Sequence, residues 1–276
     1  MATLSITVPS KPEHHGILVA FLESREVEGF RELETELVVF VDQEFAPPIL
    51  EALATELKRF TTGPLTNDII PNRNWNAEWE NSIDSITAGG FWIRPTWNAD
   101  ETPEECIEVI IDPQMSFGTG YHESTRLMLC GIRDHARTGD VVLDAGTGTG
   151  VLAIAALKSG ARRADVFDFD PICEKNAREN AVLNDVGAAI SVYLGDESVI
   201  PGDFYDLILA NINREALRGM LPVLASKMTP GGRMGLSGLL FSDREIMLGA
   251  IVKSELRALE EYREGQWWSI WVTANG

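Results

Sequence analysis

Short apolar runs alternate with amphipathic helical patterns from residue 108 to the end of the chain. The apolar runs predict strands at Val109–Asp112, Val141–Asp144, Asp165–Asp168, Ile190–Leu194, Leu207–Ala210, Met234–Ser237 and Trp267–Val272. The segments between them predict helices at Ser124–Arg137, Val151–Ser159, Pro171–Asn184 and Arg214–Met228. This alternation is typical of an open, doubly wound α/β sheet whose ligand lies at the carboxyl ends of the strands. We therefore expect a Rossmann-like domain over residues 99–276.

The first 70 residues carry a second, smaller α/β pattern. Strand-like runs at Leu4–Val8 and Leu37–Val41 alternate with helical patterns at His15–Glu23 and Pro48–Arg59. This order predicts a small ferredoxin-like α/β domain at residues 1–70. The segment contains no glycine-rich loop and no catalytic constellation, so a role in substrate recognition is expected.

Tryptophan is concentrated between the two predicted domains. Residues 71–98 follow a segment rich in Thr, Pro, Asn and Gly and are expected to form a linker. A helix is expected over Asn74–Ser85, with Trp75 and Trp79 on one face, followed by a strand-like run at Phe91–Trp97. Tryptophans at this density usually fix the packing of a connector. A cage for a substrate amine is the alternative.

The chain is strongly acidic, with 42 Asp and Glu against 23 Lys and Arg and a net charge of -19. This disfavours direct nucleic-acid binding, because phosphate recognition needs clustered basic residues. It suits a basic protein partner, although an acidic surface also serves solubility alone. No apolar stretch approaches the roughly 20 residues of a membrane span. No secretory signal is visible, and the three cysteines lack metal-ligand spacing. A cytoplasmic protein without a bound metal is expected.

The segment Val141–Gly150 joins a predicted strand to a predicted helix through three glycines. Glycine has no Cβ, so Gly146 and Gly148 allow a ligand to lie against the backbone. Asp168 ends the next predicted strand, where an acid can accept hydrogen bonds from both hydroxyls of a ribose. These features predict a nucleoside ligand.

Asp144, directly before the glycines, distinguishes two classes of nucleoside ligand. The dinucleotide fingerprint G-x-G-x-x-G places a pyrophosphate at the helix N-terminus. Here an acid precedes G-x-G-x-G, and its carboxylate would repel phosphate. The pattern resembles the first motif of class I methyltransferases, which bind the cationic, phosphate-free S-adenosylmethionine. A nucleotide-phosphate site and a turn without a ligand are the alternatives.

A loop over Asp112–Thr125 precedes the glycine turn and contains two glycines of its own, Gly118 and Gly120. Such a loop is flexible enough to fold over a ligand. Hydroxyl side chains at its end, Ser124 and Thr125, can cap the following helix or contact the ligand.

This loop, the glycine turn and the Ala-Asn-Ile segment at residues 210–212 together resemble the bacterial methyltransferases of ribosomal protein L11, the PrmA family. Further matches lie at Leu152–Lys158, Asp168–Pro171, Glu179–Ala181, Gly231–Gly232 and Leu236–Gly238, and upstream at Trp75, Trp79 and Trp92–Trp97. The similarity is close over residues 72–240 and weak over the first 60. The combination of the three motifs is specific, whereas the glycine turn alone identifies only a superfamily.

The resemblance implies contacts to S-adenosylmethionine at Phe117, Gly118, Thr119, Thr125, Asp144, Gly146, Gly148, Asp168 and Asn211. Asn211 could also position the acceptor amine through its carbonyl oxygen, and His122 is a candidate catalytic base. Structural roles as a turn, cap or loop residue are the alternatives for both. Asp196 is a further candidate, beside the adenine. The chain departs from the family pattern at Tyr121, Glu123 and Thr147, where the family has threonine, proline and cysteine.

We therefore expect a methyltransferase that uses S-adenosylmethionine to modify lysine side chains of ribosomal protein L11, with an N-terminal amine as a further candidate acceptor. One alternative is an enzyme of this scaffold that acts on another protein, such as an electron-transfer flavoprotein, or on a small molecule. Another is a noncatalytic nucleoside-binding module that docks a partner. The sequence has no feature that fixes the oligomeric state, and we expect a monomer.

Overall fold

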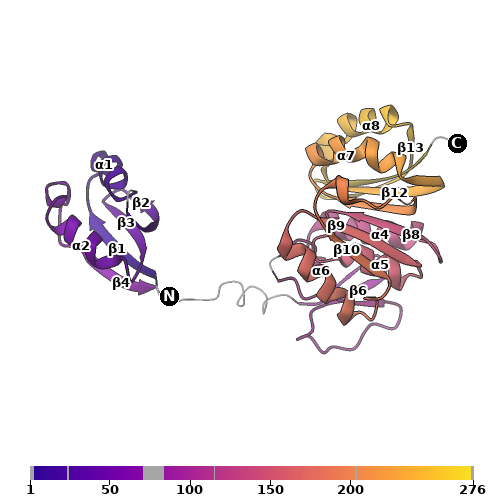
Figure 1. Cartoon of the computed structure of the whole chain (residues 1–276), viewed down its shortest axis with the longest axis horizontal. Helices are drawn as coiled ribbons and strands as arrows, with labels where there is room; N and C mark the ends of the chain where they lie inside the picture. The colour runs from indigo at the N-terminus through magenta and orange to yellow at the C-terminus, as the bar shows by residue number, and fades with distance from the viewer. Residues whose placement is uncertain (1–2, 24, 71–83, 115, 203, 275–276) are drawn as a thin grey trace. The chain divides into compact units, whose positions relative to one another are not determined.

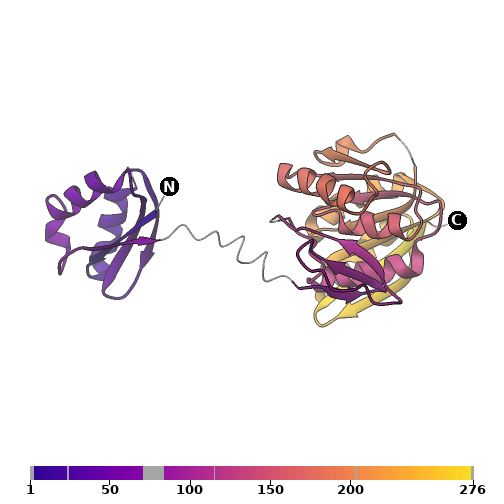
Figure 2. The same ribbon diagram turned by 90° about the horizontal axis from the view of Figure 1, so that it is seen from below.

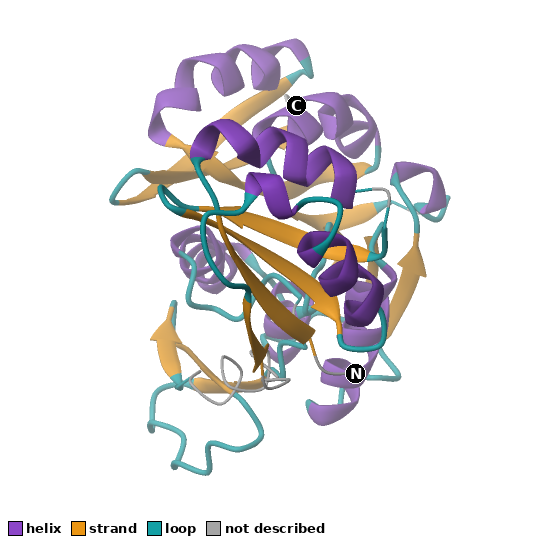
Figure 3. Cartoon of the chain, turned by 90° about the vertical axis from the view of Figure 1, so that its left-hand side faces the viewer, coloured by secondary structure: helices purple, strands orange, loops and turns teal. Residues whose placement is uncertain are grey.

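The computed structural model describes residues 3–23, 25–70, 84–114, 116–202 and 204–274. The chain divides into two compact units, Met1–Trp75 and Asn76–Gly276, which are distinguished by colour in Figure 1. Each unit has a hydrophobic core of its own. Figure 3 shows the helices and strands of both units by colour.

The first unit is an antiparallel sheet covered by two helices. Its elements are β1 (Thr3–Pro9), α1 (Pro12–Leu22), β2 (Val27–Glu32), β3 (Glu36–Asp42), α2 (Ala46–Ala54), the 3-10 helix η1 (Lys58–Phe60) and β4 (Thr66–Ile70). The strand order β2-β3-β1-β4 confirms the predicted ferredoxin-like arrangement. Leu4, Ile6 and Val8 alternate along β1 and pack into one core with both helices. The edge strands β2 and β4 are largely exposed, so their sequences lack the apolar alternation that would predict them.

The second unit is built on a seven-stranded sheet of order β10-β9-β8-β11-β12-β14-β13. Its strands are β8 (Val141–Ala145), β9 (Arg163–Asp168), β10 (Ile190–Leu194), β11 (Tyr205–Asn211), β12 (Met228–Leu240), β13 (Leu256–Glu264) and β14 (Trp267–Ala274). Strands β8 to β12 are parallel, and β14 is antiparallel to both of its neighbours. This arrangement confirms the predicted doubly wound fold.

Helices cover both faces of this sheet (Figure 1). They are α4 (Glu123–His135), α5 (Val151–Lys158), α6 (Pro171–Leu183), α7 (Arg214–Ser226) and α8 (Arg244–Lys253), with 3-10 turns η2 (Glu197–Val199) and η3 (Phe241–Asp243). Met128, Ile154 and Ala177 of α4, α5 and α6 belong to one core cluster. Leu217 of α7 and Met247 of α8 belong to the other. The sequence pattern does not predict α8 or β13, and β13 is a charged edge strand with little apolar alternation.

Part of the predicted linker is folded into the second unit. Strands β5 (Ile86–Ala88), β6 (Phe91–Arg94) and β7 (Ile107–Ile110) form a separate three-stranded sheet, drawn in purple in Figure 2. Phe91, Ile93 and Val109 are fully or almost fully buried in the core shared with α4 and α5. The linker prediction over residues 71–98 is therefore wrong for residues 86–94, because their apolar side chains are core residues.

The structure describes only part of the rest of the linker predicted over residues 71–98. The helix over Asn74–Ser85 and the side chains of Trp75 and Trp79 lie outside the described residues, apart from two loop positions at the end of the range. The predicted strand ends at Arg94, before Pro95, which has no backbone N–H for a sheet. None of the helices in the described ranges combines the length and apolar character that a membrane crossing requires.

Candidate ligand site at the carboxyl ends of the strands

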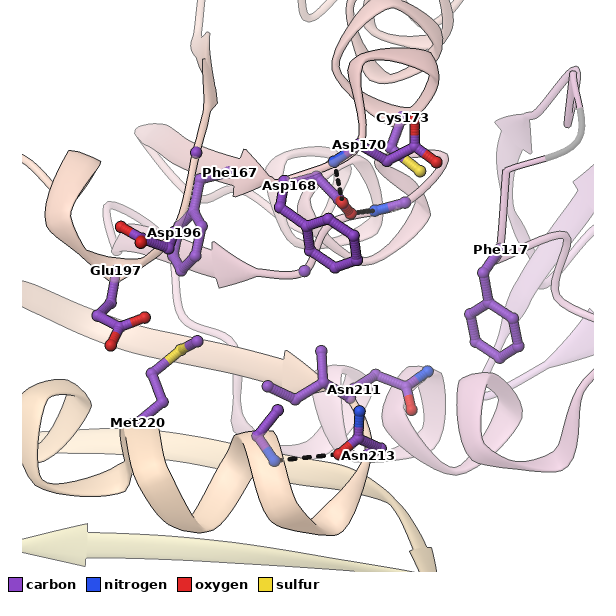
Figure 4. A pocket seen from close by; sticks show the side chains of 16 residues that line it. Phe117, Phe167, Asp168, Asp170, Cys173, Asp196, Glu197, Asn211, Asn213 and Met220 are labelled. Atoms are coloured by element: carbon purple, nitrogen blue, oxygen red, sulfur yellow. Dashed lines mark hydrogen bonds between the residues drawn. The ribbon is translucent and has the colours of Figure 1, made fainter.

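A cavity of about 550 Å³ lies at the carboxyl ends of the central strands (Figure 4). Asp196 follows β10, Asp168 ends β9, Gly146 follows β8 and Asn211 ends β11. Because the strand order is β10-β9-β8-β11, these four residues follow one another in the same order along the cavity. The cavity therefore spans the point where strand order reverses, which is the usual ligand site of doubly wound sheets.

Asp168 is held in place by the backbone. Its Oδ2 accepts a hydrogen bond from the Gly148 N–H at 3.0 Å, and its Oδ1 accepts one from the Asp170 N–H at 3.1 Å. Each carboxylate oxygen has a second lone pair, so both can still accept a hydrogen bond from a ligand hydroxyl. The geometry suits the adjacent hydroxyls of a ribose, as the sequence predicts.

The glycines of the turn are needed for the backbone conformation and packing of the protein, and not only for the approach of a ligand. Gly146 and Gly148 have φ of 71° and 55°, a left-handed conformation that favours glycine. A Cβ on Gly146 would lie 2.4 Å from Cγ2 of Ile212, and one on Gly148 would lie 2.2 Å from the carbonyl oxygen of Phe117. The sequence argument considered only the approach of a ligand. In the fold, two neighbouring loops close on the turn and form the cavity wall.

Asp144 lies beneath the turn rather than in the cavity wall. Its side chain is fully buried, and Oδ2 accepts a hydrogen bond from the Thr147 hydroxyl at 2.8 Å. Oδ1 has no hydrogen-bond partner among the described residues. Burial raises the pKa of Asp144 to about 7, against an ordinary value of 3.8. Asp144 is not among the described residues that line the cavity, so we interpret it as a support of the turn.

The cavity lining is acidic. Asp168, Asp170, Asp196 and Glu197 contribute carboxylates, and none of the described residues that line the cavity is a lysine or an arginine. Asp196 accepts a hydrogen bond from the Ser198 N–H, and its hydrogen bonds with Ser198 lower the pKa of its carboxyl group. These carboxylates would repel a phosphate and would stabilise a sulfonium or ammonium group. The lining therefore fits S-adenosylmethionine better than a nucleotide.

Asn211 presents an acceptor at the β11 end of the cavity. Its Nδ2 donates to the Thr125 hydroxyl at 3.3 Å, while its Oδ1 is buried without a partner among the described residues. An unpaired buried carbonyl oxygen costs free energy, which a ligand N–H can recover. Thr125 is itself fully buried and does not line the cavity. We therefore interpret Thr125 as the residue that orients Asn211.

His122 is the N-cap of α4, a role that the sequence assigned to Ser124 or Thr125. Its Nδ1 accepts a hydrogen bond from the Ser124 N–H at 3.2 Å. In the neutral ring this nitrogen carries the basic lone pair, so capping and proton abstraction compete. The ring also packs against Trp267, with 4.3 Å between ring centroids. The geometry thus favours a positioning role over the predicted base.

Phe117, Gly118 and Thr119 bound the site through the loop before α4. Phe117 lines the main cavity, whereas Gly118 and Thr119 line a second cavity that adjoins it at Phe117. The loop is fixed to the glycine turn, because the Thr149 N–H donates to the Phe117 carbonyl at 2.9 Å and the Thr149 hydroxyl to the Gly118 carbonyl at 2.7 Å.

Several apolar lining residues were not identified from the sequence. These residues include Ala216 and Met220 of α7 and Phe169 of the β9–α6 loop. Ala216 and Met220 are four positions apart and therefore share a helix face. Phe169 is 83% exposed and directly follows Asp168. The helical spacing of Ala216 and Met220 and the position of Phe169 after an acid are visible in the sequence. Until the fold is known, however, these residues cannot be distinguished from ordinary packing or surface residues.

The chain resembles one family over almost its whole length. The family model described as ribosomal protein L11 methyltransferase (PrmA) matches residues 10–275. The ribosomal protein L11 methyltransferase of Bacteroides fragilis is 32% identical over 95% of this chain and 94% of that protein. The corresponding protein of Chlorobaculum parvum is 35% identical over 92% of this chain and 90% of its own length. Among solved structures, a ribosomal protein L11 methylase from Lactobacillus delbrueckii subsp. bulgaricus has a TM-score of 0.66 at 27% identity and covers 70% of this chain and 100% of that chain.

Gly148→Ala should weaken binding of S-adenosylmethionine by at least tenfold, because the new Cβ would displace the Phe117 carbonyl and open the cavity wall. Gly265→Ala is the matched control, since Gly265 has φ of 57° and a Cβ added there would meet nothing within 4 Å. Both variants incur the left-handed strain of about 1 kcal/mol, but only Gly148→Ala should lose affinity in titration calorimetry. Equal affinities for both variants would contradict this packing argument.

Asp144→Asn should flatten the pH dependence of stability. The folded chain binds the Asp144 proton more tightly than the unfolded chain, so the free energy of unfolding falls as pH rises from about 4 to about 7. The variant lacks this titration and should gain about 2 to 4 kcal/mol relative to wild type across that window. Urea unfolding of both proteins at several pH values measures the difference. A difference independent of pH would show that Asp144 titrates normally.

Proposed function

Because the chain belongs to the ribosomal protein L11 methyltransferase family and its methyl donor is S-adenosylmethionine, we propose that it methylates lysine side chains of ribosomal protein L11. The observation that carries this proposal is the acidic cavity with an Asn211 carbonyl oxygen that has no hydrogen-bond partner among the described residues. The same carbonyl could accept an N–H of the incoming amine and fix its direction of approach.

S-adenosylmethionine would supply a methyl group bonded to a cationic sulfur. A neutral amine would attack the methyl carbon in one step: the C–N bond forms, the C–S bond breaks, and the sulfur leaves with the electron pair. Asp168 anchors the nucleoside part through its two fixed oxygens. Asn211 aligns the amine, so that the reaction gains from positioning. On the loop and the glycine turn we assign cofactor contacts to Phe117, Gly146 and Gly148, which line the main cavity. Asp144 and Thr125 would support these contacts from behind the cavity wall, and the other predicted loop contacts line the adjoining cavity.

The acceptor lysine must be neutral to react, yet only about one in 2,000 lysine side chains is neutral at pH 7. We propose that this proton passes to solvent before methyl transfer, since the basic nitrogen of His122 already caps α4. The acidic cavity attracts the charged lysine but also stabilises its protonated form. Positioning rather than base catalysis then supplies most of the rate enhancement.

We assign recognition of ribosomal protein L11 to the first unit, which the sequence delimits at residues 1–70. None of the described residues that line the main cavity belongs to it. Its surface includes a pocket whose lining has four acidic residues and one basic residue, which on balance suits a basic protein: Glu23, Glu26, Glu28, Asp42 and Arg25. Chemical cross-linking between this unit and ribosomal protein L11 tests the assignment. Cross-links confined to the second unit would reject it.

Asp168→Ala should weaken S-adenosylmethionine binding by tens-fold, on the order of 2 kcal/mol, because charge-assisted hydrogen bonds to the ribose are lost. Asp170→Ala is the control in the same cavity. Asp170 caps α6 through the Ile172 N–H, so its removal should lower stability by about 1 kcal/mol with little loss of affinity. Titration calorimetry and thermal unfolding separate the two effects. Wild-type affinity in Asp168→Ala would reject the ribose site.

Purified protein should add methyl groups to lysines of ribosomal protein L11, as mass spectrometry of its peptides would show. Asn211→Ala should lower kcat by about tenfold or more through lost alignment of the amine. The rate should rise with pH up to the lysine pKa, and His122→Asn, which retains a capping side chain, should keep that profile.

Methyl transfer to another acceptor only would reject the lysine assignment. A plateau near pH 7 that disappears in His122→Asn would instead identify His122 as the base.

A further inference from the structure

A second cavity of about 500 Å³ lies beside the main one. It is lined by Ser116, Phe117, Gly118, Thr119, Tyr121, His122 and Glu123. Phe117 belongs to both cavities and separates them. The described residues of the second cavity come entirely from the loop before α4 and from the first residue of that helix.

The second cavity adjoins the end of the main cavity at which methyl transfer would occur. Asp196 and Glu197 lie on one side of the main cavity and Phe117 on the other, with Asn211 between them (Figure 4). The same helix α4 that begins with Glu123 also carries Thr125, which accepts the hydrogen bond from Asn211. The second cavity therefore adjoins the Phe117 side of the main cavity and lies opposite the side of Asp196 and Glu197.

The second cavity has a carboxylate that is free to bind a cation. Glu123 forms no ion pair within 4 Å among the described residues, and no lysine or arginine is among those that line the cavity. The nearby Arg126 pairs with Glu264 and donates to the Tyr121 carbonyl. Arg126 also attracts Glu123 over a longer distance, which adds to the rise in the Arg126 pKa, but among the described residues it forms its ion pair with Glu264 and none with Glu123.

Aromatic side chains line the same cavity as this carboxylate. Phe117 is 53% exposed and Tyr121 is 38% exposed. The His122 ring lies 5.3 Å from the Phe117 ring, measured between centroids. Exposed ring faces beside a free carboxylate are the chemistry that recognises an alkylammonium group. Ser116 lines the same cavity, and its buried hydroxyl has no oxygen or nitrogen partner among the described residues.

We propose that the second cavity is the entry site for the acceptor lysine, with Glu123 attracting its ammonium group and the Phe117 and Tyr121 rings contacting its methylene stem. This inference rests on the proposed function, because it names the part of that site which receives the substrate. Glu123 attracts the charged lysine side chain, and Asn211 aligns the neutral amine. Removal of the Glu123 charge should thus affect substrate binding and not the chemical step.

Glu123→Gln tests the proposal with the full-length protein, S-adenosylmethionine and ribosomal protein L11. The KM for ribosomal protein L11 should rise about three- to tenfold at low salt, and the increase should shrink as salt screens the lost attraction. The kcat and the affinity for S-adenosylmethionine should stay at wild-type values. Glu123→Pro should behave alike, because proline is well tolerated at the first position of a helix and His122 already has the extended backbone that proline requires before it.

Glu245→Gln is the matched control. Glu245 also lies in the first turn of a helix, α8, and pairs with Arg244 at 3.2 Å, so its substitution removes the same charge near a helix N-terminus together with one exposed ion pair. It should leave KM unchanged. A wild-type KM in Glu123→Gln, with the wild-type protein methylating lysine normally, would overturn the inference alone. An equal rise in Glu245→Gln would show a general charge effect and would also overturn it. A wild-type protein that methylates no lysine would reject the proposed function.

Discussion

The close approach of the glycine turn to the Phe117 loop is the contact on which the site depends. A side chain on Gly148 would overlap the Phe117 carbonyl oxygen, while the Gly148 N–H donates to Asp168. Thr149 then binds the same loop through its N–H and its hydroxyl. One turn thus joins the end of β8 to Asp168 on β9, the acid that we propose binds the ribose, and to the loop that separates the two cavities. Because these are backbone contacts, they tolerate few substitutions on the turn.

The parts of the site that depend on local chemistry could be predicted from the sequence. The glycine turn and Asp168 each follow a buried strand, and parallel strands bring their carboxyl ends together. Asn211 could be identified only by resemblance, since an asparagine after a strand is an ordinary turn residue. The cap at His122 was missed because Ser and Thr are the usual caps, and the choice depends on the exact start of α4.

The errors in the fold have a common physical cause. Hydrophobic periodicity reports burial, so it predicts central strands and fails for exposed edges such as β2, β4 and β13. At residues 86–94 the apolar run did predict a strand, but the tryptophan-rich composition suggested a connector although the apolar residues enter the core. Both errors arise because a sequence pattern shows that a residue is suited to burial but does not show which surface covers it.

The small sheet has a consequence for the acceptor side of the site. Tyr121 donates its hydroxyl hydrogen to the Asp84 carbonyl, and a side chain on Gly120 would lie 2.9 Å from Cδ1 of Ile86. The loop is therefore shaped on one side by the glycine turn and on the other by the segment that leads into β5. Tyr121 replaces the threonine of the family pattern, and a threonine would be too short to reach Asp84 in this way. The same substitution that adds an aromatic surface beside Glu123 thus also anchors the loop that presents it.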